Sequence, residues 1–439
     1  MNAKRVVGIL LLSVGLLSAQ SYRSIVKKIA ETPALQSARL MQKAAQEMAV
    51  AAEGKNLPSL DVDLQGAWLK DTPTMILHFP GLPGPSRPVP MGRTRNFTGE
   101  VKLSYPLFTG FAISAEIDRS RLEAERARLE VLDAKRNLFL QATRLYGGIE
   151  ATEASLRALV EAKKATLSAL KKAEGLYKNG LIPPADLYNI KARVYDVEAS
   201  ITEARSRREQ LLNQLSYLAG VRVERLDGTI ALPSIPAPGS LKERAYRSRG
   251  DLRALQTLLR VDEAQIRLAE SRYYPRVGVA AAWKRQGDTP ALDGDGFTNP
   301  DRSYVGVDLS WNLFSGGADR HRVEAARYKR LSAASSLLDY RRRVATEIDN
   351  AYAQLRALRS KLQSARMRVK AQQEYYQLTR GRFDNQMASA DELSRSIADL
   401  ANARAQKAAL QSQIRVQRAK IWLLSGVENF EKTLGIAQR

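Results

Sequence analysis

The chain has 439 residues, no cysteine, only two histidines and a formal net charge of +23. Without thiols it can form no disulfide and carry no lipid on an N-terminal cysteine, and two histidines are too few for a typical zinc site or Ser-His-Asp triad. We therefore expect a protein that is not an enzyme, with no catalytic, cofactor-binding or metal-binding residues and no cofactor.

Residues 1–19 have the pattern of a signal peptide. Lys4 and Arg5 precede an apolar run from Val6 to Leu17, and Ala19 is a small residue suited to cleavage. The run is too short to span a bilayer as a helix, and no later apolar stretch approaches about 18 residues. If this exported protein lies in a membrane, we expect strands to hold it there.

The sequence repeats itself at an offset of 206 residues. Without a gap, this offset aligns Leu103–Gly110 with Leu309–Gly316, and Leu218–Val221 with Leu424–Val427. The chain is therefore predicted to be a tandem duplication. Its parts are a first repeat at 20–221, a Pro-rich connector at 222–239, a second repeat at 240–427 and a C-terminal tail at 428–439.

Each repeat is predicted to run helix, strand, loop, strand, long helix, tight turn, helix. In the first repeat these elements, up to the turn, are 20–54, 60–69, 70–96, 97–107, 110–178 and 179–184. In the second they are 240–273, 276–284, 285–302, 303–314, 317–384 and 385–390. The long segments are rich in strong helix formers, and their leucines follow a 3.5-residue spacing typical of a coiled-coil seam. A dimeric coiled coil or a rod-like tether is the alternative interpretation.

The four strand segments alternate apolar and polar residues, as do Leu60, Val62 and Leu64 with Asp61 and Asp63. Alternation fits a transmembrane barrel strand with lipid on one face and water on the other, although a small soluble sandwich would also show it. Four strands cannot close a barrel, and an open edge cannot face lipid, so at least two copies must share one barrel.

Aromatic residues mark both ends of these strands, which favours a membrane position with aromatic girdles against outer-membrane lipid. We expect Trp68, Phe97 and Trp283 at the loop ends of their strands, and Tyr105 and Trp311 at the helix ends, with Tyr273 and Tyr274 just beyond.

Two copies of the pattern L-x-x-x-L-F-x-G, at Leu103–Gly110 and Leu309–Gly316, stand at the junctions of strand and helix. With the segment Tyr177–Ile182, followed by Asp186 and Leu187, the chain resembles the TolC-like outer membrane efflux proteins. The resemblance implies a mainly α fold with a transmembrane β part. It implies a homotrimer whose twelve helices form a periplasmic α-barrel continuous with a twelve-stranded β-barrel, four strands per subunit.

The resemblance also implies a place and a role. The subunit would lie in the cell outer membrane with a long periplasmic extension and would dock to a periplasmic adaptor and an inner-membrane pump. It would conduct substrates passively in a tripartite efflux or type I secretion system. The alternatives are a non-conducting exported coiled-coil adaptor or envelope tether and, more remotely, a basic coiled-coil nucleic-acid binder. Export and the mixing of Lys and Arg with Glu along the helices argue against nucleic acid as a partner.

The two helical turns are the adaptor-docking tips that the resemblance implies. Their residues are Asn179, Gly180, Leu181 and Ile182 in the first turn and Asn385, Gln386, Met387 and Ala388 in the second. Alternatively, Leu181 and Ile182 pack onto their own hairpin. Gln386 departs from the glycine that the family usually places there, so the two tips need not be equivalent.

Charged residues beside the turns are candidates for a periplasmic gate or selectivity ring, namely Asp186, Asp391, Glu392 and Arg395. A ring of acids, repeated by symmetry, would favour cations or hold a closed gate. A local capping box formed by Ser389 and Glu392 is the competing explanation, and Arg395 stands where the family would have a second acid. The Pro-rich loop 70–96, which contains His78, is expected to constrict the extracellular mouth by its stiffness.

Overall fold

The computed structural model describes residues 19–76, 88–294 and 300–436. The predicted signal peptide up to residue 18 lies outside the described residues, as does the middle of the Pro-rich loop with His78. Helices account for 69% of the described residues, which makes the fold mainly α. Unit 1 contains the residues up to Leu40, Arg128–Ala254 and Leu338–Arg439, and unit 2 contains Met41–Ala127 and Leu255–Leu337.

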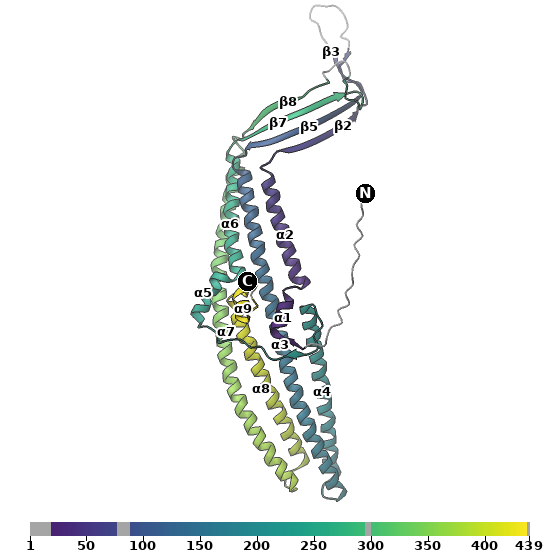
Figure 1. Ribbon diagram of the computed structural model, residues 1–439, viewed down its shortest axis with the longest axis vertical. Helices are drawn as coiled ribbons and strands as arrows, with labels where there is room; N and C mark the ends of the chain where they lie inside the picture. Colours follow the sequence, from purple (N-terminus) through teal and green to yellow (C-terminus); the bar gives the residue numbers. More distant parts are fainter. Residues whose placement is uncertain (1–18, 77–87, 295–299, 437–439) are drawn as a thin grey trace, which may run out of the picture. The chain divides into compact units, whose positions relative to one another are not determined.

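Unit 2 is built around a four-stranded antiparallel sheet. Its strands are β2 (Ser59–Trp68), β5 (Arg95–Phe108), β7 (Arg276–Gly287) and β8 (Tyr304–Ser310), hydrogen-bonded in the order β2-β5-β7-β8 (Figure 1). The short strands β3 (Thr74–Ile76) and β4 (Pro88–Pro90) pair with each other in the first loop. Strands from both repeats therefore share one sheet, joined where β5 pairs with β7.

The structure corrects the ends of the second hairpin. Strand β8, expected over 303–314, ends at Ser310, whose partner is Arg276. The residue before Arg276 is Pro275, which has no N–H to donate and so cannot extend the ladder. Strand β7, expected to end at residue 284, continues to Gly287, because its Gln286 and Gly287 still pair with Thr98 and Phe97 of β5.

Unit 1 contains most of the long helices, α3 (Ala112–Lys178), α4 (Pro184–Ala219), α7 (Ala318–Asp384) and α8 (Ala390–Leu424). The 67-residue helices α3 and α7 also extend into unit 2, and each is about 100 Å long at 1.5 Å per residue. One apolar cluster joins all four helices, and Figure 1 shows α8 between α7 and α3. Alanines in this cluster, among them Ala162 and Ala169, let the backbones approach closely.

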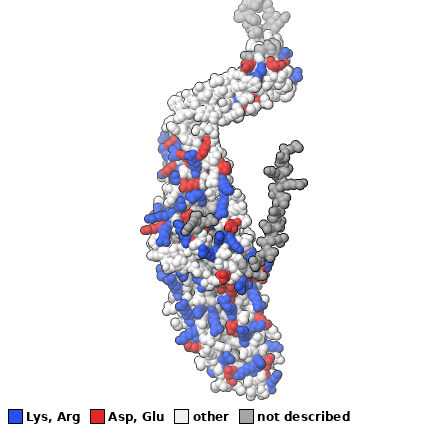
Figure 2. Space-filling model, in the orientation of Figure 1, with Lys and Arg blue, Asp and Glu red and all other residues white. Residues whose placement is uncertain are grey.

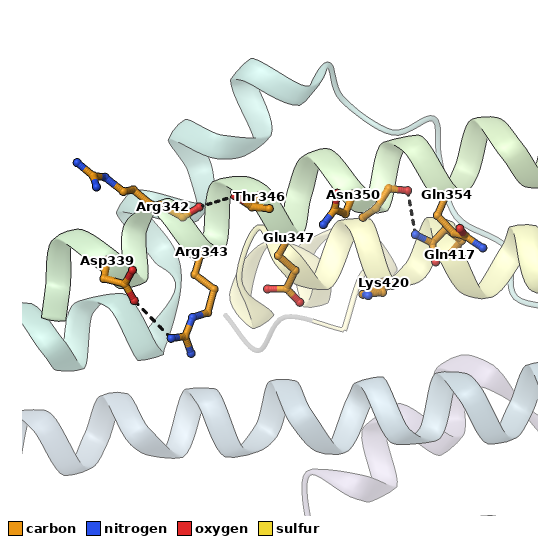
Figure 3. Close-up of a pocket in the computed structure, with 10 residues that line it drawn as sticks. Asp339, Arg342, Arg343, Thr346, Glu347, Asn350, Gln354, Gln417 and Lys420 are labelled. Carbon is orange, nitrogen blue, oxygen red and sulfur yellow. Dashed lines mark hydrogen bonds and ion pairs between the residues drawn. The ribbon is translucent and has the colours of Figure 1, made fainter.

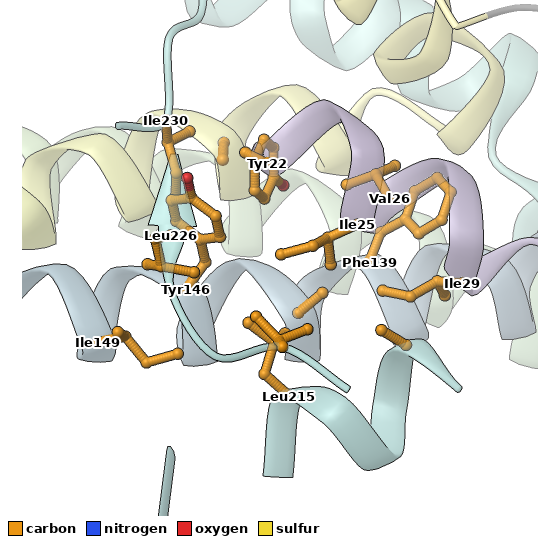
Figure 4. Packing of buried hydrophobic residues seen from close by; sticks show 14 of the residues in the cluster. Tyr22, Ile25, Val26, Ile29, Phe139, Tyr146, Ile149, Leu215, Leu226 and Ile230 are labelled. Carbon is orange, nitrogen blue, oxygen red and sulfur yellow. The ribbon is translucent and has the colours of Figure 1, made fainter. Parts of the chain in front are cut away.

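The main core of unit 1 gathers segments from both chain ends. Helix α1 (Tyr22–Ile29) packs on α3, and the connector adds Leu226 and Ile230 (Figure 4). Leu226 belongs to β6 (Leu226–Asp227), which pairs in parallel with β1 (Gln20–Ser21). The segment expected as a C-terminal tail is instead helix α9 (Val427–Leu434), because the ring of Phe430 is fully buried in this core.

Two helices that the sequence presents as continuous are broken. The first splits into α1 and α2 (Pro33–Gly54), with a turn before Pro33. The second splits into α5 (Pro238–Ser248) and α6 (Gly250–Glu270), which is followed by a 3-10 turn, Ser271–Tyr273. Arg249 between them has an extended backbone, with φ −68° and ψ 126°. A Cβ on the next residue, Gly250, would lie 2.6 Å from the carbonyl oxygen of Leu129, so only glycine fits there.

Arg249 is buried in a network of charges at this break. Its guanidinium lies 2.6 Å from the Asp251 carboxylate and 3.2 Å from Glu347 of α7. Asp251 also accepts from Arg136 of α3 at 3.2 Å and from the Tyr340 hydroxyl at 2.7 Å. Burial alone would raise the pKa of Asp251, but the hydrogen bonds and charges of these partners lower it overall. The network connects three helices of unit 1 through one buried arginine.

Candidate membrane sheet and helical turns

One face of the sheet is apolar and exposed. Residues that share a face follow from the register, in which Val62 pairs with Val101 and Val101 with Trp283. Leu64 on β2 is 80% exposed and Val305 on β8 is 81% exposed. A folded protein rarely leaves a contiguous row of such side chains to water. The sheet in Figure 2 is correspondingly almost free of charged atoms on the side in view.

The other face of the sheet is polar. Asp61 pairs with Lys102 and Asp63 with Glu100, and Lys284 donates to Glu100 at 2.9 Å. Asp308 of β8 belongs to the same face, since it pairs with Gly278, which pairs with Pro106. The alternation expected from the sequence thus separates apolar and charged side chains onto opposite faces of one sheet.

The aromatic residues at the loop end are only partly brought together. The Trp68 and Phe97 rings meet edge to face with centroids 5.5 Å apart, at the end of β2 and the start of β5. Trp283, expected at the same level, instead pairs with Val101, four residues further along β5 than Phe97. It lies deeper in the sheet because β7 continues beyond it to Gly287.

At the helix end the aromatic residues gather around the 3-10 turn. The Trp311 indole N–H donates to the Tyr273 carbonyl at 3.1 Å, and the Tyr274 ring lies 5.5 Å from that of Phe111. Tyr105 pairs with Val279 of β7 on the apolar face. Phe111 and Phe314, both exposed, join this group although they are not among the aromatic residues expected at the helix end. Phe314 stands inside the L-F-x-G pattern and Phe111 directly follows it, so the motif already marked this place.

Both outer strands of the sheet have one free edge. Among the residues that the structure describes, β2 bonds only to β5, and β8 bonds only to β7. The free edges present backbone N–H and C=O groups without a strand partner within this subunit.

The two helical turns have the same backbone, although only one has glycine at its centre. In the first, Leu181 N–H donates to Leu176 and Gly180 N–H to Tyr177, both at 2.9 Å. In the second, Met387 N–H donates to Arg382 at 2.7 Å and Gln386 N–H to Phe383 at 3.1 Å. These are the two bonds of a Schellman motif, and Gln386 adopts the left-handed conformation (φ 63°) just as Gly180 does (φ 68°). The two tips therefore have the same backbone conformation, although Gln386 stands where the first tip has Gly180.

Each turn exposes one apolar side chain and packs another. Leu181 is 51% exposed and Met387 is 63% exposed, whereas Ile182 and Ala388 pack against the cluster that joins the four helices. The alternative interpretation of the first turn therefore holds for Ile182 but not for Leu181. Asn179 and Asn385 play matching roles, because each side-chain amide caps the end of its helix, on Gly175 and Gly381.

The charged residues beside the turns form local ion pairs. Asp391 lies 2.6 Å from Arg395, and Glu392 lies 3.0 Å from Arg382 at the end of α7. Ser389 caps α8 by accepting from the Glu392 N–H at 3.2 Å, so half of the expected capping box is formed. Asp186 lies in the first turn of α4, on the other helical hairpin. Within one subunit, two of the candidate gate acids are thus already paired with arginine.

The described residues contain no helix long and apolar enough to cross a membrane. They also contain no group of three or more His, Asp or Glu side chains placed to hold a metal ion.

Comparisons with known proteins identify the family. The chain matches the family described as Outer membrane efflux protein over residues 25–221 and 241–427. No curated protein matches its sequence. Among solved structures it resembles the outer membrane protein VceC from Vibrio cholerae, with a TM-score of 0.74 and 18% identity over 92% of this chain and 96% of that one. It resembles CusC with a TM-score of 0.78 and 13% identity over 93% of both chains.

A third solved structure, the CmeC outer membrane channel from Campylobacter jejuni, has a TM-score of 0.74 and 14% identity over 95% of this chain and 87% of that one. At these identities the structural likeness shows a shared fold, and the family match over both halves confirms the resemblance seen in the sequence. The chain belongs to the outer membrane efflux proteins, a family of outer-membrane channel proteins and not of enzymes.

Proposed function

We propose that three copies of this chain form a passive conduit through the periplasm and the outer membrane. In this assembly twelve strands, four from each copy, close one barrel, and twelve helices form a periplasmic tunnel. The observation that carries the proposal is the sheet of unit 2, with one apolar exposed face, one charged face and two free edges.

The hydrogen-bonding needs of the backbone favour assembly of several copies. In lipid, each unsatisfied N–H or C=O group costs several kcal/mol, so a four-stranded sheet with open edges is unstable there. Pairing β8 of one copy with β2 of the next satisfies both edges and closes a ring. The apolar face then meets lipid, and Asp61, Asp63 and Asp308 line the water-filled interior.

The helical turns supply the contact with partners. Leu181 and Met387 are exposed at the ends of the two helical hairpins, where an adaptor with its own apolar surface would bury them. We place a periplasmic adaptor there and an inner-membrane pump behind it, because membership of the outer membrane efflux proteins implies both partners. Asp186 and the paired acids Asp391 and Glu392 are the candidate gate. Drug efflux and type I secretion are two uses of the same conduit.

The proteins of similar fold support this function by their own roles. CmeC is described as an outer membrane channel, and CusC as a protein whose conformational changes accompany folding and transmembrane channel formation. A non-conducting adaptor or tether, by contrast, would have no reason to present an exposed row of leucine and valine on a sheet with free edges.

The test combines outer-membrane fractionation with conductance in planar bilayers. We expect the purified protein to migrate as a heat-modifiable trimer and to give stable conductance steps. A matched pair of variants on adjacent residues of β2 sharpens the test. Val62→Lys places a charge on the apolar face and should abolish insertion, because lysine near the bilayer midplane costs about 2–4 kcal/mol. Asp61→Lys places the same charge on the polar face and should insert normally.

Two results would count against the proposal. One is a wild-type protein that stays monomeric in detergent and conducts nothing. The other is equal insertion of the two lysine variants, which would mean that the apolar face does not meet lipid.

A further inference from the structure

Two hollows on unit 1 join into one polar groove, which we call the inner groove. The first, about 660 Å³, lies between α7 and α8, and Figure 3 shows Glu347, Gln354 and Lys420 among its lining residues. The second, about 760 Å³, continues across α8 to α3 and α4. Gln354 and Gln417 line both, so the groove crosses all four long helices on one side.

The inner groove lies on the side of α3 opposite to the core. Its lining residues on α3 follow a helical spacing of three or four residues: Arg144, Gly148, Ala151 and Ser155. The α3 residues that contact α1 and the connector, Thr143, Tyr146 and Glu150, project from the other side of the helix. Helix α1, the connector and α9 cover one side of the helical layer. The opposite side, which contains the inner groove, is therefore the side that can line the proposed conduit.

Small residues line the bottom of the inner groove and let the helix backbones approach closely there. A Cβ on Gly147 of α3 would clash with the Val416 side chain of α8, so the two backbones lie closer than any larger residue would allow. Gly148, Ala151 and Ser155 extend this low floor along α3. The longer polar side chains therefore stand at the margins of a hollow.

The charges that line the inner groove are predominantly positive. Among the described residues, four basic side chains line the groove without an ion pair: Arg144, Arg207, Arg342 and Lys420. Of the acidic residues that line it, only Glu203 has no ion pair within the described part of the chain. The other two lining acids are neutralised locally: Asp339 pairs with Arg343, as the dashed line in Figure 3 shows, and Glu347 pairs with Arg249.

We propose that the inner groove binds anionic groups and makes the conduit prefer anions to cations. The inference rests on the proposed function, because it takes the groove side of the helices as the side that borders the path. Three copies repeat the positive cluster around that path, within reach of one another's field at low ionic strength. The cargo class that this favours is organic anions, such as carboxylated, sulfonated or phosphorylated compounds.

The first experiment measures the sign of the preference in planar bilayers under a tenfold KCl gradient. We expect the wild-type reversal potential to show greater permeability for chloride than for potassium. The triple variant Arg144→Gln/Arg207→Gln/Lys420→Gln should lower the chloride-to-potassium permeability ratio by about threefold or more. A control, Arg157→Gln/Lys171→Gln/Arg205→Gln, removes the same charge from exposed positions outside the groove and should leave the ratio unchanged.

The second experiment needs no conduction. Binding of the trianionic dye pyranine to the detergent-purified protein is followed by fluorescence anisotropy at low and at physiological salt. The triple groove variant should bind about tenfold more weakly at low salt than wild type or the control variant.

The outcomes separate the two proposals. A wild-type protein that conducts but prefers potassium, or two triple variants with equal dye affinity, would overturn the anion preference. A wild-type protein that conducts nothing yet binds the dye through the groove would overturn the conduit and leave the anion site standing.

Discussion

At the scale of single residues, the buried Arg249 is the side chain on which the junction of α5, α6 and α7 depends. It is only 2% exposed and binds two carboxylates, Asp251 and Glu347. We predict that Arg249→Met destabilises the protein by about 3–5 kcal/mol, because it leaves the nearly buried Asp251 carboxylate without its main partner. Thermal unfolding in detergent measures this loss.

The matched control is Arg343→Met, which also breaks an arginine–carboxylate pair of α7, but one whose two side chains are about 70% exposed. That change should lower stability by about 1 kcal/mol or less. Similar losses for the two variants would show that the network at the helix break is not the stabilising contact that its burial indicates.

Asp251 gives the same network a predictable dependence on pH. Its partners lower its pKa in the folded protein below the unfolded value of about 3.9. Its contribution to stability is therefore complete above about pH 4 and is lost as the pH falls through the folded pKa. We predict that Asp251→Asn is less stable than wild type at pH 7 but loses less stability between about pH 4 and pH 2. Parallel melting curves across that range would contradict this assignment.

At the scale of elements, the two turns allow the same backbone to be compared with and without glycine. Gln386 holds a left-handed conformation that glycine adopts more readily, so Gln386→Gly should stabilise the second hairpin by up to about 1 kcal/mol. Gly180→Ala should destabilise the first by about the same amount. A Cβ at Gly180 meets no atom within 4 Å, so that loss would come from the backbone alone. Melting temperatures that move in the same direction for both variants would contradict this explanation.

Two adjacent glycines of α3 should respond in opposite ways to alanine. Gly147→Ala forces a Cβ against Val416 and should lower stability by about 1–3 kcal/mol, and Val416→Ala in the same chain should restore most of it. Gly148→Ala, whose Cβ would meet Leu211 at an ordinary 3.5 Å, should be neutral or stabilising because alanine favours helix. Thermal unfolding of the three variants tests the difference in sign.

The elements also show where sequence reasoning succeeds and where it fails. Periodicity predicts the strands and long helices, because the position of a side chain such as Leu64 or Leu393 within its own strand or helix decides which face it lies on. It fails at Ser310, where β8 ends because its neighbour begins after Pro275. It also fails at Arg249, where the helix is interrupted and the next residue, Gly250, lies close to the distant Leu129 backbone. Phe430 was missed for the same reason, since the core that buries it comes from α1 and α3. The charges of the inner groove likewise come together only in three dimensions.

At the scale of the whole molecule, the absence of native cysteine makes the proposed ring directly testable. Within one copy, β2 and β8 are separated by two strands and lie about 14 Å apart, too far for a disulfide. We therefore predict that Asp61→Cys, combined in turn with a cysteine at Gly306, Asp308 or Ser310, yields reducible covalent trimers in at least one pairing. Non-reducing electrophoresis of outer membranes reads out the result.

The control combines Asp61→Cys with Ala282→Cys, which lies on the same face of the sheet but in the inner strand β7. It should give no covalent oligomer, because β7 already has a neighbour on each side. Ladders longer than three copies, or equal cross-linking in both sets, would contradict a closed ring of three.

The free edges of β2 and β8 also have a consequence before the ring forms. A newly exported subunit exposes two strand edges that can pair with any other strand. Productive assembly therefore competes with aggregation, and the outcome depends on the concentration of the subunit in the periplasm. Edge strand β8 has only seven residues, and β2 carries Asp61 and Asp63, both features that weaken indiscriminate pairing. Overproduction of the chain should overwhelm this protection and leave insoluble, β-paired material, so slow expression is the condition under which complete rings are expected to accumulate.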